Sequence, residues 1–289
     1  MSAKKYTCNT VKTLSLLMAT LSSLDVIAAS FDGPDSVKPV HPLCIEPLIG
    51  QKEAMIDKGA FDMDECYEAF KDIEVKRTPD GSLYAKRPVI DADKTEGYVV
   101  YKPIGTLDGA LELIVYHDKK PEKSMKSQVV VMARLPHLTE GSREFITSID
   151  EPGARCNGGI QTARLISEAI LEVDLNSNAA YLMKTFAPEF DNLGSKGDEV
   201  ATLSLKKSAT LDDDPTHCIA TITKTYNLLD SRETVKSVAF STGFRPKADN
   251  PYQQCFDELV DDFIKPPADV EPGDMEMFKQ LLLSNCGAY

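Results

Sequence analysis

The sequence predicts an α+β protein, with an antiparallel β-sheet or sandwich core, an N-terminal helical hairpin and a C-terminal helical pair. Residues 74–246 alternate apolar and polar side chains with a period of two, and short turns separate the segments. Helical spacing of apolar residues is clearest before and after this region. Helices that are segregated from a run of strands are typical of α+β folds, and the short turns favour antiparallel pairing.

The first 28 residues have the pattern of an export signal. Lys4, Lys5 and Lys12 precede a short apolar run that ends in small residues around Ala28. Asp25 interrupts this run, which is shorter than the ~20 apolar residues that a membrane-spanning helix needs. A buried N-terminal helix is the alternative, which the three preceding lysines disfavour. We therefore expect cleavage after Ala28 and a secreted or periplasmic product without an integral membrane segment.

Residues 29–73 are expected to form a proline-rich lead followed by the helical hairpin. Asp62 and Glu65 have the spacing of a capping box, and Gly59 separates the two expected helices. The apolar face of the second helix would be formed by Met63, Cys66, Tyr67 and Phe70.

Residues 74–246 are expected to form the antiparallel core. Asp-Gly pairs at positions 80–81 and 108–109 are strong hairpin signals. The stretch Gly159–Phe186 is ambiguous, because its apolar residues fit a helix as well as strands. The Asn-Ser-Asn turn at 176–178 favours strands on both of its sides.

Residues 247–289 are expected to form an acidic helical pair that packs on the core as part of one domain. Asp249 or Asn250 suits the N-cap of a helix, and Pro251 suits its first position. A second helix is expected from Gly273 to Asn285. Residues 249–289 contain nine acidic residues and two lysines, which makes this the most negative part of the chain.

Six cysteines remain after removal of the signal, and an even number in an exported chain predicts disulfides. No Cys-x-x-Cys pair supports a zinc ribbon or a redox site. Fifteen pairings are possible in principle. Each expected helical unit holds two cysteines and the β-region holds the other two, so we hypothesise sequential pairing. The pairs would be Cys44–Cys66, Cys156–Cys218 and Cys255–Cys286.

The string Cys156-Asn157-Gly158-Gly159 resembles a Cys-Asn-Gly-Gly string in the papain family of cysteine proteases. In that family the nucleophile belongs to a different motif, an upstream Cys followed by Trp, and it acts with a later His and Asn. This chain contains no Trp. We interpret the string as a glycine turn that presents a disulfide cysteine, with the glycines supplying positive φ.

No motif in the sequence predicts a catalytic residue or a cofactor. A weak candidate for a metal site is the acidic loop with Asp212, Asp213, Asp214 and His217. The alternative is a solvated loop whose charges protect a strand edge from aggregation. The stretch Asp91–Gly97 imitates the start of an EF-hand loop, but its glycine comes one place late and Lys102 stands where the glutamate belongs.

The net charge of −13 at pH 7 limits the partners. Such a chain repels phosphate backbones and anionic lipids, so nucleic acid is not an expected partner and a basic protein surface is favoured. We hypothesise an exported, disulfide-stabilised acidic binding or interaction protein. The alternative is a secreted hydrolase whose catalytic Asp/Glu pair comes together only in the fold and cannot be recognised in the sequence. A structural envelope component is a third possibility. Two convergent carboxylates with raised pKa values in a cavity would favour the hydrolase.

Overall fold

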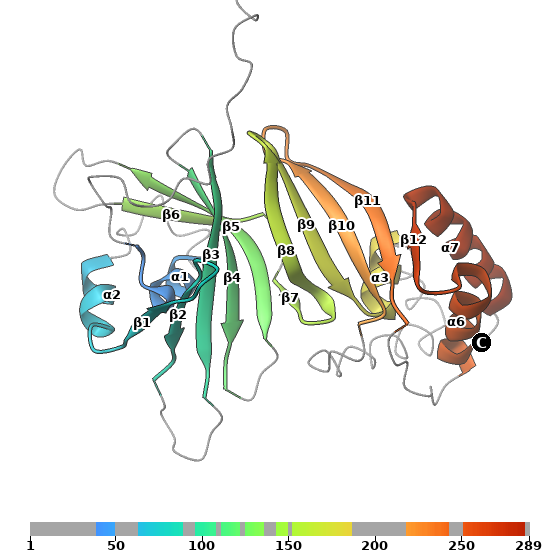
Figure 1. Cartoon of the computed structure of the whole chain (residues 1–289), viewed down its shortest axis with the longest axis horizontal. Helices are drawn as coiled ribbons and strands as arrows, with labels where there is room; N and C mark the ends of the chain where they lie inside the picture. Colours follow the sequence, from blue (N-terminus) through green and yellow to red (C-terminus); the bar gives the residue numbers. More distant parts are fainter. Residues whose placement is uncertain are drawn as a thin grey trace, which may run out of the picture. The chain divides into compact units, whose positions relative to one another are not determined.

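A single antiparallel sheet of twelve strands dominates the part of the chain that the computed structural model describes (Figure 1). That part comprises residues 39–49, 63–88, 96–107, 111–121, 125–135, 143–149, 152–186, 218–242 and 251–286. The strand order is β1-β2-β3-β4-β5-β7-β8-β9-β10-β11-β12, and β6 pairs with β5 beside this path. Sequential hairpins therefore build most of the fold, as the short turns predict.

The first half of the sheet contains six strands. They are β1 (Val75–Arg77), β2 (Leu83–Lys86), β3 (Tyr98–Leu107), β4 (Leu111–Lys119), β5 (Lys126–Leu135) and β6 (Arg143–Ser148). The predicted Asp-Gly turn at 80–81 joins β1 to β2, and Gly81 has a φ of 85°. The second predicted Asp-Gly turn, at 108–109, lies outside the described residues, between the paired strands β3 and β4.

The second half of the sheet contains the other six strands. They are β7 (Gly153–Ala154), β8 (Asn157–Ser167), β9 (Ile170–Ser177), β10 (Ala220–Asn227), β11 (Arg232–Phe240) and β12 (Ala268–Val270). The two-residue strand β7 pairs with both β5 and β8, and so connects the halves into one sheet.

The described helices are short compared with the sheet. They are α1 (Pro42–Ile49), α2 (Met63–Ala69), α3 (Ala179–Phe186), α6 (Pro251–Leu259), the π-helix η3 (Val260–Ile264) and α7 (Pro272–Cys286). No helix among the described residues has the length and apolar character required to cross a bilayer.

The predicted α+β class with an N-terminal helical hairpin is wrong. The helix α1 has only eight residues, includes Pro47, and buries Leu43 and Ile45 in a cluster with sheet residues such as Tyr101. The helix α2 has seven residues, most of them exposed. Each helix is too short to bury a continuous apolar stripe against the other, and the sheet takes the apolar face of α1 instead. The predicted cap Asp62 and the break at Gly59 lie outside the described residues.

The expectation of strands on both sides of the 176–178 turn is half right. The residues before the turn form the hairpin β8–β9, but the residues after it form α3. The side-chain oxygen of Asn178 accepts a hydrogen bond from the Tyr181 amide at 2.8 Å, which is an N-cap interaction. Asparagine therefore initiates a helix here instead of closing a hairpin.

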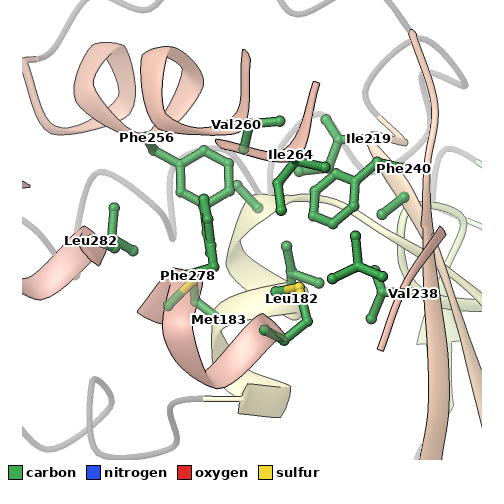
Figure 2. Close-up of a cluster of buried hydrophobic side chains, with 14 of the residues drawn as sticks. Leu182, Met183, Ile219, Val238, Phe240, Phe256, Val260, Ile264, Phe278 and Leu282 are labelled. Carbon is green, nitrogen blue, oxygen red and sulfur yellow. The ribbon is translucent and has the colours of Figure 1, made fainter. Parts of the chain in front are cut away.

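The helices α3, α6 and α7 cover one face of the β10–β12 end of the sheet. Figure 2 shows Leu182 and Met183 converging with strand residues Val238 and Phe240 and with residues of the C-terminal helices. The rings of Phe256 and Phe278 meet edge to face at 5.7 Å between centroids. Burial of this many apolar side chains is the main stabilising contribution at this end of the sheet.

Three disulfides crosslink the chain: Cys44–Cys66, Cys156–Cys218 and Cys255–Cys286. These are the pairs that the distribution of the cysteines predicts. Their Cα–Cα distances of 6.0, 4.8 and 5.8 Å lie in the normal range for disulfides. The first links α1 to α2, the second links the β7–β8 turn to the start of β10, and the third links α6 to α7. A disulfide-stabilised, β-rich structure is compatible with an oxidising compartment.

Candidate functional site

The acidic loop with Asp212, Asp213, Asp214 and His217 lies outside the described residues, so its proposed metal-binding role stays a prediction. Within the described ranges, no group of three or more His, Cys, Asp or Glu side chains is placed to hold a metal ion. The six cysteines from Cys44 to Cys286 are all in disulfides, so their sulfur atoms have a structural role.

Cys156 lies in the two-residue turn between β7 and β8, and Asn157, Gly158 and Gly159 are the first residues of β8, so the glycines do not form the turn itself. Gly158 has a φ of 78°, and a Cβ there would lie 2.7 Å from the ring of Tyr181. A Cβ on Gly159 would lie 2.5 Å from the carbonyl oxygen of Ala154. Side chains are therefore excluded at both glycines, and the start of β8 packs directly against α3.

Two links hold this turn in place. Cys156 forms its disulfide with Cys218, immediately before β10. The carbonyl oxygen of Cys156 also accepts a hydrogen bond from the amide of Asn178, the N-cap residue of α3, at 2.5 Å. The turn, α3 and β10 are thus fixed relative to one another, and residues next to this junction line an open cavity.

That cavity, which we call the Lys224 cavity, has a volume of about 510 Å³. Residues from the β7–β8 turn, from α3 and from the strands β10 and β11 line it. The lining consists of Pro152, Gly153, Asn157, Gly158, Tyr181, Lys184, Thr185, Lys224, Glu233 and Val235. A cavity of this size is in the range of small-molecule sites.

Lys224 occupies a position on β10 where an apolar residue would be expected. It lies directly opposite Val173 of β9, and it alternates with Ile222 and Tyr226 on the buried face of β10. The lysine side chain is only 8% exposed. Burying an ammonium group is unfavourable unless the charge is compensated.

Two neighbours compensate the charge of Lys224. Its Nζ lies 2.6 Å from Oε1 of Glu233 on β11, and 5.7 Å from the centroid of the Tyr181 ring. A half-buried ion pair and a cation–π contact are favourable, but a well-packed apolar residue would stabilise such a position at least as well. Stability alone therefore does not explain the lysine, and its charged end borders the Lys224 cavity.

The lining of the Lys224 cavity can recognise a small organic anion. It contains two lysines, Lys184 and Lys224, and one carboxylate, from Glu233, in a chain whose net charge is strongly negative. Tyr181 and Val235 supply apolar surface beside these charges.

A second cavity, which we call the Tyr116 cavity, has a volume of about 200 Å³ and lies beside α1 and the strands β4 and β5. Its lining consists of Glu46, Ile49, Tyr116, Asp118, Lys126, Gln128 and Pro152. Two carboxylates that are far apart in the sequence thus meet at one cavity, as the hydrolase alternative requires.

The electrostatics of this pair do not match a hydrolytic acid. Arg87 donates hydrogen bonds at 2.6 Å to both Glu46 and Asp118, and Lys120 also bonds to Glu46. Burial alone would raise the pKa of Glu46, but the hydrogen bonds from Lys120 and Arg87 outweigh it and lower the pKa below its ordinary value. A general acid needs the opposite shift, so Glu46 does not match the acid that the hydrolase alternative requires.

No family model, curated protein or solved structure matches this chain. Sequence reasoning missed both cavities, although one signal was present. In Ala220–Tyr226 the period of two places Lys224 on the same face as alanine, isoleucine and tyrosine, with threonines on the other face. The residues around the Tyr116 cavity carry no such signal, because the fold gathers them from separate segments.

Proposed function

We propose that the protein is an exported binding protein that holds a small organic anion in the Lys224 cavity. The observation that carries the proposal is the position of Lys224, a lysine on the core-facing side of a strand whose charged end borders a cavity. The three disulfides and the predicted export signal support an extracellular or periplasmic site of action.

The fold supports a preformed site. The Cys156–Cys218 disulfide holds one wall, and the N-capped helix α3 provides another. A ligand would therefore bind without ordering these two walls, and less of the binding free energy would be lost to conformational entropy.

The proposal can be tested with anilinonaphthalene sulfonate, an aromatic anion that fluoresces when it leaves water. The mature chain, residues 29–289, would be titrated beside Lys224→Met and Lys184→Met. Methionine keeps the length of the side chain and removes the charge. The matched control is Lys236→Met on the neighbouring strand β11. Lys236 is 59% exposed and forms an ion pair with Glu172.

We expect saturable binding that weakens about tenfold or more in Lys224→Met, since a hydrogen bond to a charged group contributes about 1.5–3 kcal/mol. Lys184→Met should weaken binding less, because that side chain is exposed. Lys236→Met should bind like the unmodified protein. Equal affinity for all four proteins would refute the proposal.

A basic protein partner is a second candidate. Exposed carboxylates follow one another along the C-terminal helices and in the segment just before α7: Glu258, Asp261, Asp262, Glu271, Asp274 and Glu276. Such a surface would attract a basic partner, and added salt would weaken this attraction by screening the charges. The test is the affinity for a lysine-rich peptide. It should fall steeply with salt and fall further when Asp261 and Asp262 are changed to asparagine; an affinity independent of both would contradict this candidate.

A further inference from the structure

The arginine in the β7–β8 turn has no partner. Arg155 is exposed, and it forms no hydrogen bond or ion pair with the part of the chain that the structure describes. Three of the other arginines with described side chains, Arg87, Arg164 and Arg232, form ion pairs with carboxylates. Among these described arginines, only Arg77 on the edge strand β1 resembles Arg155 in this respect. The planar guanidinium of Arg155 is therefore available to an anion from solution.

Arg155 lines an open cavity of about 450 Å³, which we call the Arg155 cavity. The walls of this cavity come from both halves of the sheet. Tyr98 and Lys119 are cross-strand neighbours on β3 and β4, while Asn176 belongs to β9. The fold thus brings a turn and two separate strand pairs together around one space.

Close backbone packing places Arg155 beside Asn176. Gly159 of β8 lies directly opposite Asn176 of β9. A Cβ on Gly159 would lie only 2.6 Å from the carbonyl oxygen of Arg155, so the turn backbone occupies the space where a side chain would stand. The disulfide of the neighbouring Cys156 holds the same turn. A ligand therefore does not have to order the backbone at Arg155.

The side chain of Asn176 is a second polar group without a partner. Asn176 is half-buried at the wall of the Arg155 cavity, and its carboxamide has no hydrogen bond to a described residue. The next residue on the same face of β9 is satisfied, because Asp174 accepts hydrogen bonds from Thr162 and Thr223 at 2.6 and 2.8 Å. The amide N–H group of Asn176 can therefore donate to a ligand oxygen beside Arg155.

The charge of the lining favours an anion. Arg155 and Lys119 line the cavity, and no acidic side chain does so among the described residues. Even when Asp174 on the adjoining part of β9 is counted, the basic residues outnumber the acidic one. Tyr98 and Met125 add apolar surface, and the Tyr98 hydroxyl lies 3.7 Å from the Met125 sulfur. The lining thus combines positive charge with a small apolar wall.

We propose that the Arg155 cavity binds a small phosphate monoester. The phosphate group of such a molecule carries a charge of about −1.5 to −2 at pH 7, and the forked guanidinium of Arg155 donates two parallel hydrogen bonds to it. The Asn176 amide donates a further hydrogen bond, and the ammonium group of Lys119 adds positive charge. The organic substituent of the ester lies against Tyr98 and Met125.

This site is separate from the Lys224 cavity, because the two cavities have no described lining residue in common. The inference therefore goes beyond the proposed function, and either can fail without the other. An aromatic anion can enter both cavities, so the test needs a signal that belongs to one of them.

The test is a titration of the isotope-labelled, oxidised protein with phenyl phosphate, followed by NMR. The side-chain amide signal of Asn176, identified by its loss in Asn176→Ser, reports on the Arg155 cavity and not on the Lys224 cavity. Benzyl alcohol is the uncharged counterpart of the probe. Arg155→Gln removes the proposed anchor, and Arg77→Gln removes an equally unpaired charge that lines neither cavity. Both arginines are exposed, so neither substitution removes a packed side chain.

We expect a saturable shift of the Asn176 amide signal with phenyl phosphate and none with benzyl alcohol. The affinity should fall about tenfold or more in Arg155→Gln, since hydrogen bonds between charged groups are strong, and should not change in Arg77→Gln. Absence of a saturable shift would overturn the inference, and so would equal affinities of the two glutamine variants. Equal affinities for benzyl alcohol and phenyl phosphate would overturn it as well, because the cavity would then recognise the ring instead of the phosphate.

Discussion

Removal of the hydroxyl group should destabilise the protein at Tyr101 but not at Tyr116. The two residues are cross-strand neighbours on β3 and β4, and they are 1% and 3% exposed. Each Tyr→Phe change removes one oxygen from the same buried layer. The two substitutions therefore change packing to a similar extent, and the difference in free energy of unfolding between the variants reports on hydrogen bonding.

The magnitudes follow from the partners. Tyr101→Phe deprives the carbonyl oxygen of Val40, which is 1% exposed, of its 2.8 Å hydrogen bond. Leaving a buried acceptor unsatisfied costs about 1–3 kcal/mol. Tyr116→Phe breaks no hydrogen bond to a described residue and removes an unsatisfied polar atom, so its free energy of unfolding should equal or exceed that of the parent protein.

Urea unfolding followed by far-ultraviolet circular dichroism measures both variants against the parent. We expect the midpoint to fall for Tyr101→Phe, with an unchanged slope, and to stay or rise for Tyr116→Phe. In thermal unfolding, each kcal/mol corresponds to about 2–4 °C in a domain of this size. A Tyr116→Phe protein that loses as much stability as Tyr101→Phe would refute the reasoning about the unsatisfied hydroxyl.

Two further perturbations test the ion cluster and the glycine at the start of β8. The pKa of Glu46 is lowered in the folded protein, so its contribution to stability is present above its unfolded pKa of about 4.5 and is lost as the pH falls through the folded value. Arg87→Met should therefore lose less stability than the parent as the pH falls. The urea midpoint of both proteins would be measured between pH 3 and 7, and the same dependence on pH in both would argue against this. Gly158→Ala should destabilise more than Gly81→Ala, since both glycines have positive φ but only a Cβ on Gly158 meets another side chain. Equal melting temperatures of the two alanine variants would show that this contact is not strained.

The sequence was sufficient for features that depend on local pattern. Period-two alternation and short turns identify strands such as β4, β5, β10 and β11, and apolar spacing after Pro251 identifies the C-terminal helices. The cysteine pairs followed from the grouping of cysteines within local units. These signals are local because neighbouring residues on one face share the same burial.

The errors arose where packing or a single side chain decided between local alternatives. The helix α1 gives its apolar face to the sheet, so the expected helical hairpin does not form. The side chain of Asn178 caps α3 where a turn between strands was expected. The cavities depend on residues such as Arg87 and Asp118, which only the fold brings together. Residues that are distant in the sequence and meet only in the fold leave no pattern in the sequence from which the cavity could be predicted.

Lys224 is proposed to bind an organic anion in the oxidised protein. Native mass spectrometry of the protein purified from the exported fraction of its own cells tests this directly, with Lys224→Met expressed and purified in parallel. We predict a stoichiometric additional mass on the parent protein that disappears under denaturing conditions and is absent or strongly reduced in Lys224→Met. Identical native masses for the two proteins, after allowance for the substitution, would contradict the account.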